Sequence, residues 1–118
     1  MTEESKRRLM EAGIDVDDAL ARLMQNEGLL SRLLSAFLQD GNFARLQEAL
    51  AKGDVSGAFT AAHTLKGVAG NLSLRDLFAR VSEVVECLRS GDLGAAAEKM
   101  PAVEAAYRKV ADALSAEG

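Results

Sequence analysis

One segment decides the fold of this chain: residues 55–72, which read VSGAFTAAHTLKGVAGNL. Its apolar residues recur at intervals of three and four, the spacing that places side chains on one face of an α-helix. This apolar stripe consists of Val55, Ala58, Ala62, Leu65, Ala69 and Leu72. Gly53 ends the preceding pattern and Asp54 is a typical N-capping residue. We therefore predict a helix over about residues 54–72 with one buried face.

The single histidine of the chain, His63, lies on the other side of this helix. At about 100° per residue, it points roughly 140° away from the middle of the apolar stripe, so we expect it to face solvent. Phe59, Lys66, Gly67 and Gly70 share its face. Two glycines inside a helix each cost about 1 kcal/mol relative to alanine, and they leave one flank of the imidazole without side chains. A bulky partner can then approach the ring closely.

Three helices are predicted before this segment. The first spans about residues 2–12. Asp15 caps the second, whose apolar face carries Val16, Ala19, Leu20, Leu23 and Met24. A further apolar pattern runs from Asn26 to Lys52. It continues across residues 40–42 (Asp-Gly-Asn), which either kink or end the helix, and we favour one long kinked helix.

Two more helices are predicted after the histidine segment. Ser73 is the expected N-cap of one, whose apolar face consists of Leu74, Leu77, Val81, Val84 and Leu88. Residues 90–92 separate it from the last helix, which reaches about Ser115 and is kinked or restarted by Pro101. Short connections between long amphipathic helices favour antiparallel neighbours. The predicted fold is all-α: an antiparallel up-down bundle with a four-helix core and a short extra N-terminal helix across one end.

Composition narrows the class of function. The 118 residues, of which 48% are hydrophobic, fit a single domain over residues 1–118. A net charge of −4 argues against nucleic acid and anionic membranes as partners. One cysteine and one histidine leave too few ligands for the common zinc and paired-histidine metal motifs. No signal peptide and no long apolar run occurs, which predicts a cytoplasmic protein.

The residues around His63 suit phosphoryl transfer. A neutral imidazole carries a free lone pair for nucleophilic attack. Lys66, one turn along the helix, could offset charge on the phosphoryl oxygens. The chain has no Walker-type or kinase-type glycine loop, so it is not expected to be a kinase. No cofactor is expected on this chain, because a partner protein can supply both the phosphoryl group and its Mg²⁺.

Residues 62–72, AHTLKGVAGNL, resemble the phosphoacceptor motif of the histidine-containing phosphotransfer (HPt) family. Two other segments are similar to the family as well: GIDVD at residues 13–17 and ALAKGD at residues 49–54. The resemblance thus extends over most of the chain. It implies a monomeric helical bundle whose histidine carries phosphate between receiver-domain aspartates in a multistep phosphorelay. The partners that it implies are receiver domains of response regulators and hybrid sensor histidine kinases.

The resemblance also implies a role for individual residues. His63 takes the part of the phosphoacceptor, Lys66 that of the charge-stabilising group, and Gly67 that of keeping access to the ring open. Apart from the resemblance, Phe59 and Gly70 share the face of His63 and are candidate contacts of the docked partner, although Phe59 is most simply a core residue. Mg²⁺ is expected on the receiver partner and not on this chain.

Two positions depart from the family pattern. Ser73 stands where the motif usually closes with glycine. Val85 stands on the following helix where the family often has a Gln or Glu that hydrogen-bonds the histidine ring, and the neighbouring Glu86 points about 100° away from that position. The sequence thus leaves open which residue orients the ring of His63.

Two other functions compete with a phosphocarrier. A phosphorylation-independent adaptor would dock a receiver domain or another signalling protein with the same bundle, and the acceptor-like His63 argues against it. A helical-bundle enzyme or metal protein is disfavoured because one histidine and no Glu-x-x-His pair supply few ligands. The initiating Met1 favours a free-standing carrier over a piece of a hybrid kinase.

Overall fold

The computed structural model describes residues 1–117, and these are mostly helical. The helices are α1 (Glu3–Glu11), α2 (Val16–Arg22), α3 (Glu27–Phe37), α4 (Asn42–Ala51), α5 (Val55–Asn71), α6 (Arg75–Arg89) and α7 (Leu93–Glu117). No strand occurs within residues 1–117, where one isolated bridge pairs Ile14 with Leu74. The predicted all-α class is confirmed.

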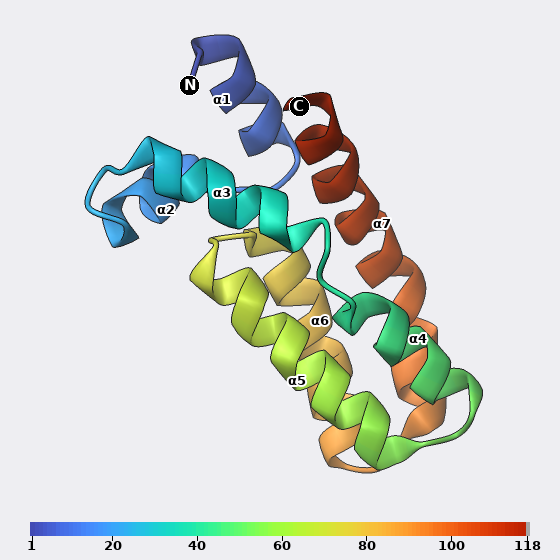
Figure 1. Cartoon of the computed structure of the whole chain (residues 1–118). Coiled ribbons are helices and arrows are strands. Elements are labelled where there is room, and N and C mark those ends of the chain that lie inside the picture. Colours follow the sequence, from blue (N-terminus) through green and yellow to red (C-terminus); the bar gives the residue numbers. More distant parts are fainter. Residues whose placement is uncertain (118) are drawn as a thin grey trace.

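Four helices form the body of the bundle. Figure 1 shows α4, α5, α6 and α7 packed side by side, each running opposite to the one before it. Residues 52–54, 72–74 and 90–92 connect them. In two of these connections a glycine adopts the left-handed conformation, Gly53 with φ +70° and Gly91 with φ +76°. Such short connections return each helix along its predecessor, an arrangement consistent with the predicted four-helix core.

The core of the bundle is largely aliphatic. Its fully buried side chains include Leu46, Leu65, Leu77, Val81, Val84 and Val103. Aromatic rings connect α3 and α4 to α7. Phe43 of α4 stacks on Tyr107 of α7 with 4.3 Å between ring centroids, and the ring of Phe37 of α3 lies 5.7 Å from the Tyr107 ring. Such aromatic pairs add about 0.5–1.5 kcal/mol beyond their burial. The rings therefore fasten α3 and α4 to α7.

The predicted long helix from Asn26 to Lys52 is wrong, because the chain forms two helices there. The side chain of Asp40 ends the helical pattern. One of its carboxylate oxygens accepts a hydrogen bond from the backbone N–H of Asn42 at 2.9 Å, and the other accepts one from the side-chain amide Nδ2 of Asn42 at 3.3 Å. An aspartate that bonds the backbone two residues further on favours a turn over a continuing helix. Figure 1 shows the non-helical segment that separates α3 from α4.

The N-terminal helices pack at one end of the molecule. Figure 1 shows α1 beside the C-terminal end of α7, where Nε of Arg8 donates to the Glu117 carboxylate at 3.0 Å. The segment between α1 and α2 is tied to the turn between α5 and α6, since the backbone N–H of Asp15 donates to the carbonyl of Ser73 at 2.8 Å. Both short helices thus lie outside the four-helix body, and their connecting segment contacts the end of α5.

Met24 does not lie on the apolar face of α2, contrary to the prediction. The helix ends at Arg22, and Met24 and Gln25 adopt left-handed φ values of +55° and +65°. This turn leads the chain into α3 and points Met24 outward, so that it is 90% exposed.

The last helix, α7, is continuous although Pro101 lies inside it. Ala96 and Val103, on either side of the proline, are fully buried, so packing offsets the hydrogen bond that proline cannot donate. Pro101 therefore does not restart the helix. Among residues 1–117, no helix has both the length and the apolar character needed to cross a membrane.

Candidate functional site

The histidine helix, α5, is capped at its start and buried along one side. The Asp54 carboxylate accepts a hydrogen bond from the backbone N–H of Gly57 at 2.9 Å and thereby caps the helix where the sequence predicts. The buried residues of this helix are Ala58, Ala61, Ala62, Leu65 and Ala69. His63 is exposed. The predicted orientation of the helix is confirmed.

The imidazole of His63 lies against Phe59, the residue one turn before it. The two rings stack with 5.7 Å between centroids and 27° between planes. Within α5 the side chain of Thr64 donates to the carbonyl of Thr60, but no hydrogen bond in residues 1–117 involves the His63 ring. Both ring nitrogens are therefore available for chemistry.

Val85 and Glu86 do not orient the histidine ring. Val85 is fully buried, and the exposed Glu86 places its carboxylate 3.3 Å from Nε of Arg89. The Arg89 guanidinium carbon lies 5.3 Å from the ring centroid of Phe59. His63 thus contacts the ring of Phe59, and the guanidinium group of Arg89 lies next to that ring. Within residues 1–117, no polar group of α6 forms a hydrogen bond with His63.

Lys66 lies half-buried one turn after His63 and leans towards α6. Its Nζ is 5.7 Å from the ring centroid of Phe78. Within residues 1–117 Lys66 forms no salt bridge, whereas Lys52 pairs with Glu48 at 2.7 Å. The ammonium group therefore keeps its donors free for an anionic group near His63.

Gly67 and Gly70 differ in their surroundings, although the sequence places both on the face of His63. A Cβ atom at Gly67 would meet nothing within 4 Å. A Cβ atom at Gly70 would lie 3.3 Å from Cε2 of Phe78. Gly67 leaves the flank of the histidine bare, whereas half-buried Gly70 makes room for an aromatic ring of α6.

Phe78 belongs to this face, and the sequence analysis did not select it. It is 38% exposed and lies beside Gly70 and Lys66. The signal was present, because Phe78 falls about 100° from Leu77 and about 60° from Val81, at the edge of the buried stripe of α6. A large aromatic side chain at the edge of a buried stripe indicates partly exposed apolar surface.

Ser73 does not cap α6, contrary to the prediction. Its φ is +57°, it is 4% exposed, and its hydroxyl donates to the Asp18 carboxylate at 2.6 Å. The N-cap of α6 is Leu74, which makes no side-chain capping bond. Glycine adopts a left-handed φ freely, which explains the glycine usual at this position of the motif. Here a partly buried hydrogen bond holds a serine in the same conformation.

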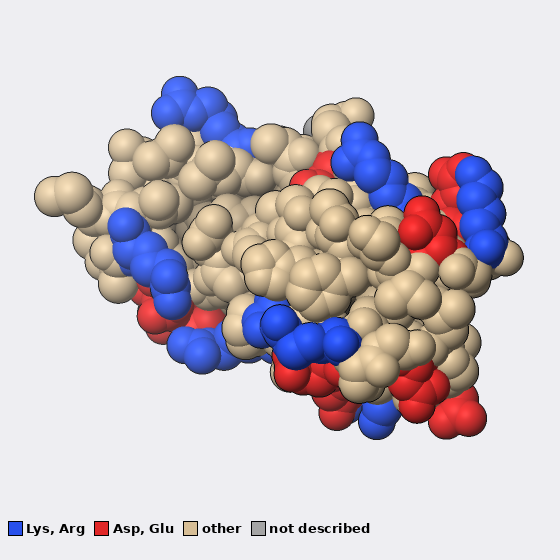
Figure 2. Space-filling view, turned by 90° about the horizontal axis from the view of Figure 1, so that it is seen from below, with Lys and Arg blue, Asp and Glu red and all other residues tan. Residues whose placement is uncertain are grey.

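Charged side chains on the surface often stand in pairs of opposite sign. Arg108 lies 2.8 Å from Glu104, and Arg75 lies 2.7 Å from Asp15. In Figure 2, blue and red side chains adjoin at several places and border a broad area that carries neither. This face of the molecule shows no continuous basic stripe.

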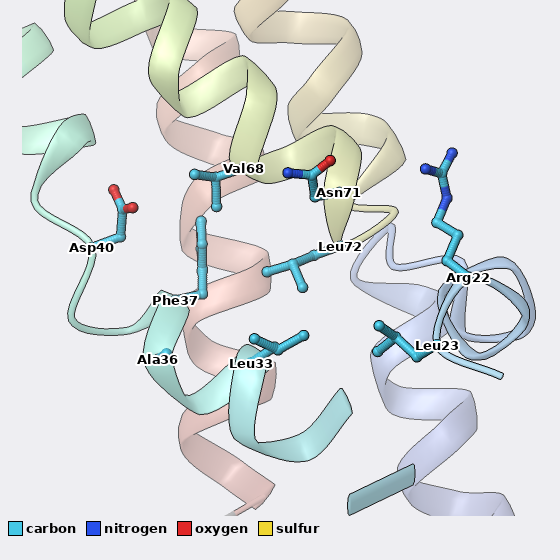
Figure 3. A pocket seen from close by; sticks show the side chains of 9 residues that line it. All are labelled: Arg22, Leu23, Leu33, Ala36, Phe37, Asp40, Val68, Asn71 and Leu72. Carbon is cyan, nitrogen blue, oxygen red and sulfur yellow. The ribbon is translucent and has the colours of Figure 1, made fainter. Parts of the chain in front are cut away.

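A cavity of about 500 Å³ lies between α2, α3 and the C-terminal end of α5. Figure 3 shows the side chains that line it, among them the apolar Leu33, Phe37, Val68 and Leu72. His63 does not line this cavity. The cavity is therefore separate from the face of α5 that carries His63.

Comparison with known protein families assigns the chain. The family described as "Hpt domain" matches residues 28–115 of the 118 residues, a span that contains α5 and His63. No curated protein and no solved structure matches the chain. Hpt domains are helical phosphocarriers of phosphorelays and are not kinases. Because the match covers well over half of the chain, this protein belongs to the Hpt domain family.

Proposed function

We propose that His63 is the phosphoacceptor of a histidine phosphotransfer protein in a multistep two-component phosphorelay. The protein accepts a phosphoryl group from the aspartyl phosphate of one receiver domain and passes it to the aspartate of another. One observation carries this proposal: the imidazole of His63 is exposed in mid-helix with both nitrogens free. Lys66 and the open position Gly67 lie one turn away.

The transfer exchanges one bond to phosphorus for another. The unprotonated ring nitrogen of neutral His63 attacks the phosphorus atom with its lone pair, and an N–P bond forms. The P–O bond to the receiver aspartate breaks, and the aspartate leaves with the electron pair as a carboxylate. The second ring nitrogen keeps its proton, so the step needs no external base. The reverse step delivers the phosphoryl group to a second receiver aspartate.

Lys66 and Gly67 assist this transfer in different ways. The Lys66 ammonium, which pairs with no carboxylate within residues 1–117, offsets negative charge on the phosphoryl oxygens. The open space at Gly67 lets a receiver bring its aspartate in line with the imidazole. The Mg²⁺ that assists phosphoryl transfer belongs to the receiver in this proposal, and this chain binds no cofactor.

The same chemistry defines the partners. Receiver domains of response regulators or of hybrid sensor histidine kinases supply and remove the phosphoryl group. The protein meets them as a monomer in the cytoplasm, with Phe59 and Gly70 near the contact, and neither nucleic acid nor a membrane takes part. Light scattering of the purified protein tests the monomer.

The variant His63→Gln tests the acceptor. Because His63 is exposed, we expect the variant to keep the circular dichroism and melting temperature of the wild type but to take up no phosphate from a phosphorylated receiver. The label on the wild type should be acid-labile and alkali-stable, as a phosphoramidate bond is. Undiminished labelling of the variant would refute the assignment. A wild-type protein that binds receivers but takes up no phosphate would favour the phosphorylation-independent adaptor instead.

A further inference from the structure

The ring that touches His63 is itself held in place. Phe59 is half-buried and packs against the hydrophobic core, and its ring lies 5.3 Å from the guanidinium carbon of Arg89. Nε of Arg89 donates to the Glu86 carboxylate at 3.3 Å. A row of side chains, Glu86, Arg89, Phe59 and His63, thus leads from the C-terminal end of α6 to the imidazole.

We infer that Phe59 and Arg89 are positioning residues that orient the His63 ring for phosphoryl transfer. The inference rests on the proposed function of His63. An exposed histidine turns about its two side-chain torsions, and only some of the resulting orientations direct a ring nitrogen away from the helix. Stacking on Phe59, which the core holds, restricts these torsions.

A stack leaves the chemistry of the ring intact. A histidine ring is commonly fixed by a hydrogen bond to one nitrogen, but no hydrogen bond in residues 1–117 reaches His63, and Val85 has no polar atom in its side chain to make one. The stacked arrangement therefore orients the ring while both nitrogens stay free. Phe59 precedes His63 by four residues, so the two side chains are neighbours on the helix surface.

Arg89 supports the stack from α6. A guanidinium group within about 6 Å of a ring centroid is attracted by the electrons of the ring. The ion pair with Glu86 limits how far the guanidinium can move away from Phe59. Through this contact α6 helps to orient His63. Val85 of the same helix cannot orient the ring, because it is buried and its side chain has no polar atom.

The variant Phe59→Leu tests the stack with phosphoramidate, a small donor that needs no docking. Leucine keeps an apolar side chain but removes the ring. We expect labelling of His63 to slow by about three- to tenfold, the effect of losing one aromatic pair. The ring-proton NMR signals of His63 should also lose the shift caused by the Phe59 ring current; they are unambiguous because the chain has one histidine. Phe59→Tyr keeps the stack and should restore both the rate and the signals.

Arg89 is tested in the same way. Arg89→Met removes the cation while keeping a long side chain, and we expect it to slow phosphoramidate labelling by about twofold or more. Arg89→Lys keeps a cation near Phe59 and should recover part of this loss. Equal rates for Arg89→Met and the wild type would remove Arg89 from the inference.

Phe43→Leu is the matched control. It also removes a ring from a stacked pair, since Phe43 stacks on Tyr107, but that pair lies between α4 and α7. It should lower the melting temperature and leave the labelling rate and the His63 signals of the folded protein unchanged. If Phe59→Leu is slow only with a receiver and normal with phosphoramidate, Phe59 is a docking residue and the inference is wrong. If the wild type takes up no phosphate from any donor, the proposed function fails instead.

Discussion

The hydroxyl of Ser73 donates a hydrogen bond to the carboxylate of Asp18, with 2.6 Å between the two oxygens. The bond joins the turn after α5 to α2, and Asp18 also accepts from Arg22 at 2.9 Å. The backbone N–H of Asp15 donates to the carbonyl of the same serine. The N-terminal part of the chain is thereby fastened to the end of the helix that carries His63.

Substitutions of Ser73 should separate the hydrogen bond from the backbone conformation. Ser73→Ala loses the bond to Asp18 and keeps a φ of +57°, whereas Ser73→Gly loses the same bond but relieves the left-handed strain. The glycine variant gains from the relief of this strain but loses some stability because an unfolded glycine has more conformational entropy. On balance we expect it to be more stable than the alanine variant by up to about 1 kcal/mol. Urea unfolding measures the difference. A glycine variant less stable than the alanine variant would contradict this explanation of the turn.

The same contacts should make the stability of the fold sensitive to acid. Hydrogen bonds from Ser73 and then from Arg22 lower the pKa of Asp18 below its usual 3.8. The backbone N–H of Asp18 and then the side chain of Arg75 lower the pKa of Asp15. A carboxyl group whose pKa is lower in the folded state stabilises the fold above its unfolded-state pKa. This contribution is lost as the pH falls through the folded-state pKa, so we expect the free energy of unfolding to decrease below pH 3.8.

The variant Asp18→Asn measures how much the charge of one carboxylate, that of Asp18, contributes to the free energy of unfolding. It should be less stable than the wild type at about pH 6, and the difference should shrink as the pH falls through the folded-state pKa of Asp18, because the wild-type carboxyl then becomes neutral as well. Urea unfolding of both proteins at a series of pH values gives the two curves. A difference that stays constant over this range would mean that the charge of Asp18 does not contribute.

The long helices could be predicted because each combines an unbroken apolar stripe with a signal at its start. Asp54 and the stripe up to Leu72 place α5 within a residue or so of its observed bounds. The break between α3 and α4 could not be predicted in this way, because apolar residues recur on both sides of it. The side chain of Asp40 decides that break by bonding the backbone of Asn42, and such a bond leaves no trace in the apolar period.

The part of the site that lies on α5 was predictable from the sequence. The part that depends on how α5 and α6 pack together was not. The period of α5 alone puts His63 on the exposed face together with Gly67. The contributions of α6 depend on how that helix is placed against α5, which neither apolar period specifies. The period of α6 indicates that Phe78 is partly exposed, but its place beside Gly70 and Lys66 emerges only from the packed structure. The same holds for the place of Arg89 beside Phe59 and for the different surroundings of Gly67 and Gly70.

Removing the charge of Lys66 should slow transfer without unfolding the bundle. Losing a group that stabilises charge in the transition state costs roughly 3 kcal/mol elsewhere, and a partly exposed lysine should matter less. We expect Lys66→Ala to transfer phosphate from a receiver about tenfold more slowly, as measured by rapid quenching, because one stabiliser of the phosphoryl oxygens is missing. Lys66→Arg keeps the charge and should recover part of the rate. Equal rates for Lys66→Ala and the wild type would leave Lys66 without a role in transfer.

Alanine at the two glycines of the histidine face should affect stability differently. Gly67→Ala adds a methyl group in open space and improves helix propensity by about 1 kcal/mol. Gly70→Ala gains the same propensity, but its methyl group would lie 3.3 Å from the Phe78 ring, which must then move. We expect thermal unfolding to show Gly67→Ala as the more stable variant. The opposite order would mean that Gly70, and not Gly67, is the position with free space.

A larger side chain at Gly67 should separate access to the histidine from stability of the helix. Glutamine is better than glycine in a helix by about 0.5 kcal/mol or more, and a side chain at this position meets nothing within 4 Å at its Cβ, so Gly67→Gln should melt no lower than the wild type. The same side chain would stand beside His63 and obstruct a docking receiver. Phosphate exchange with a receiver should therefore be much slower, while phosphoramidate still labels the histidine at a substantial rate. Normal exchange with the receiver would refute the role of Gly67 in access, and an unfolded variant would show that this position is packed and not open.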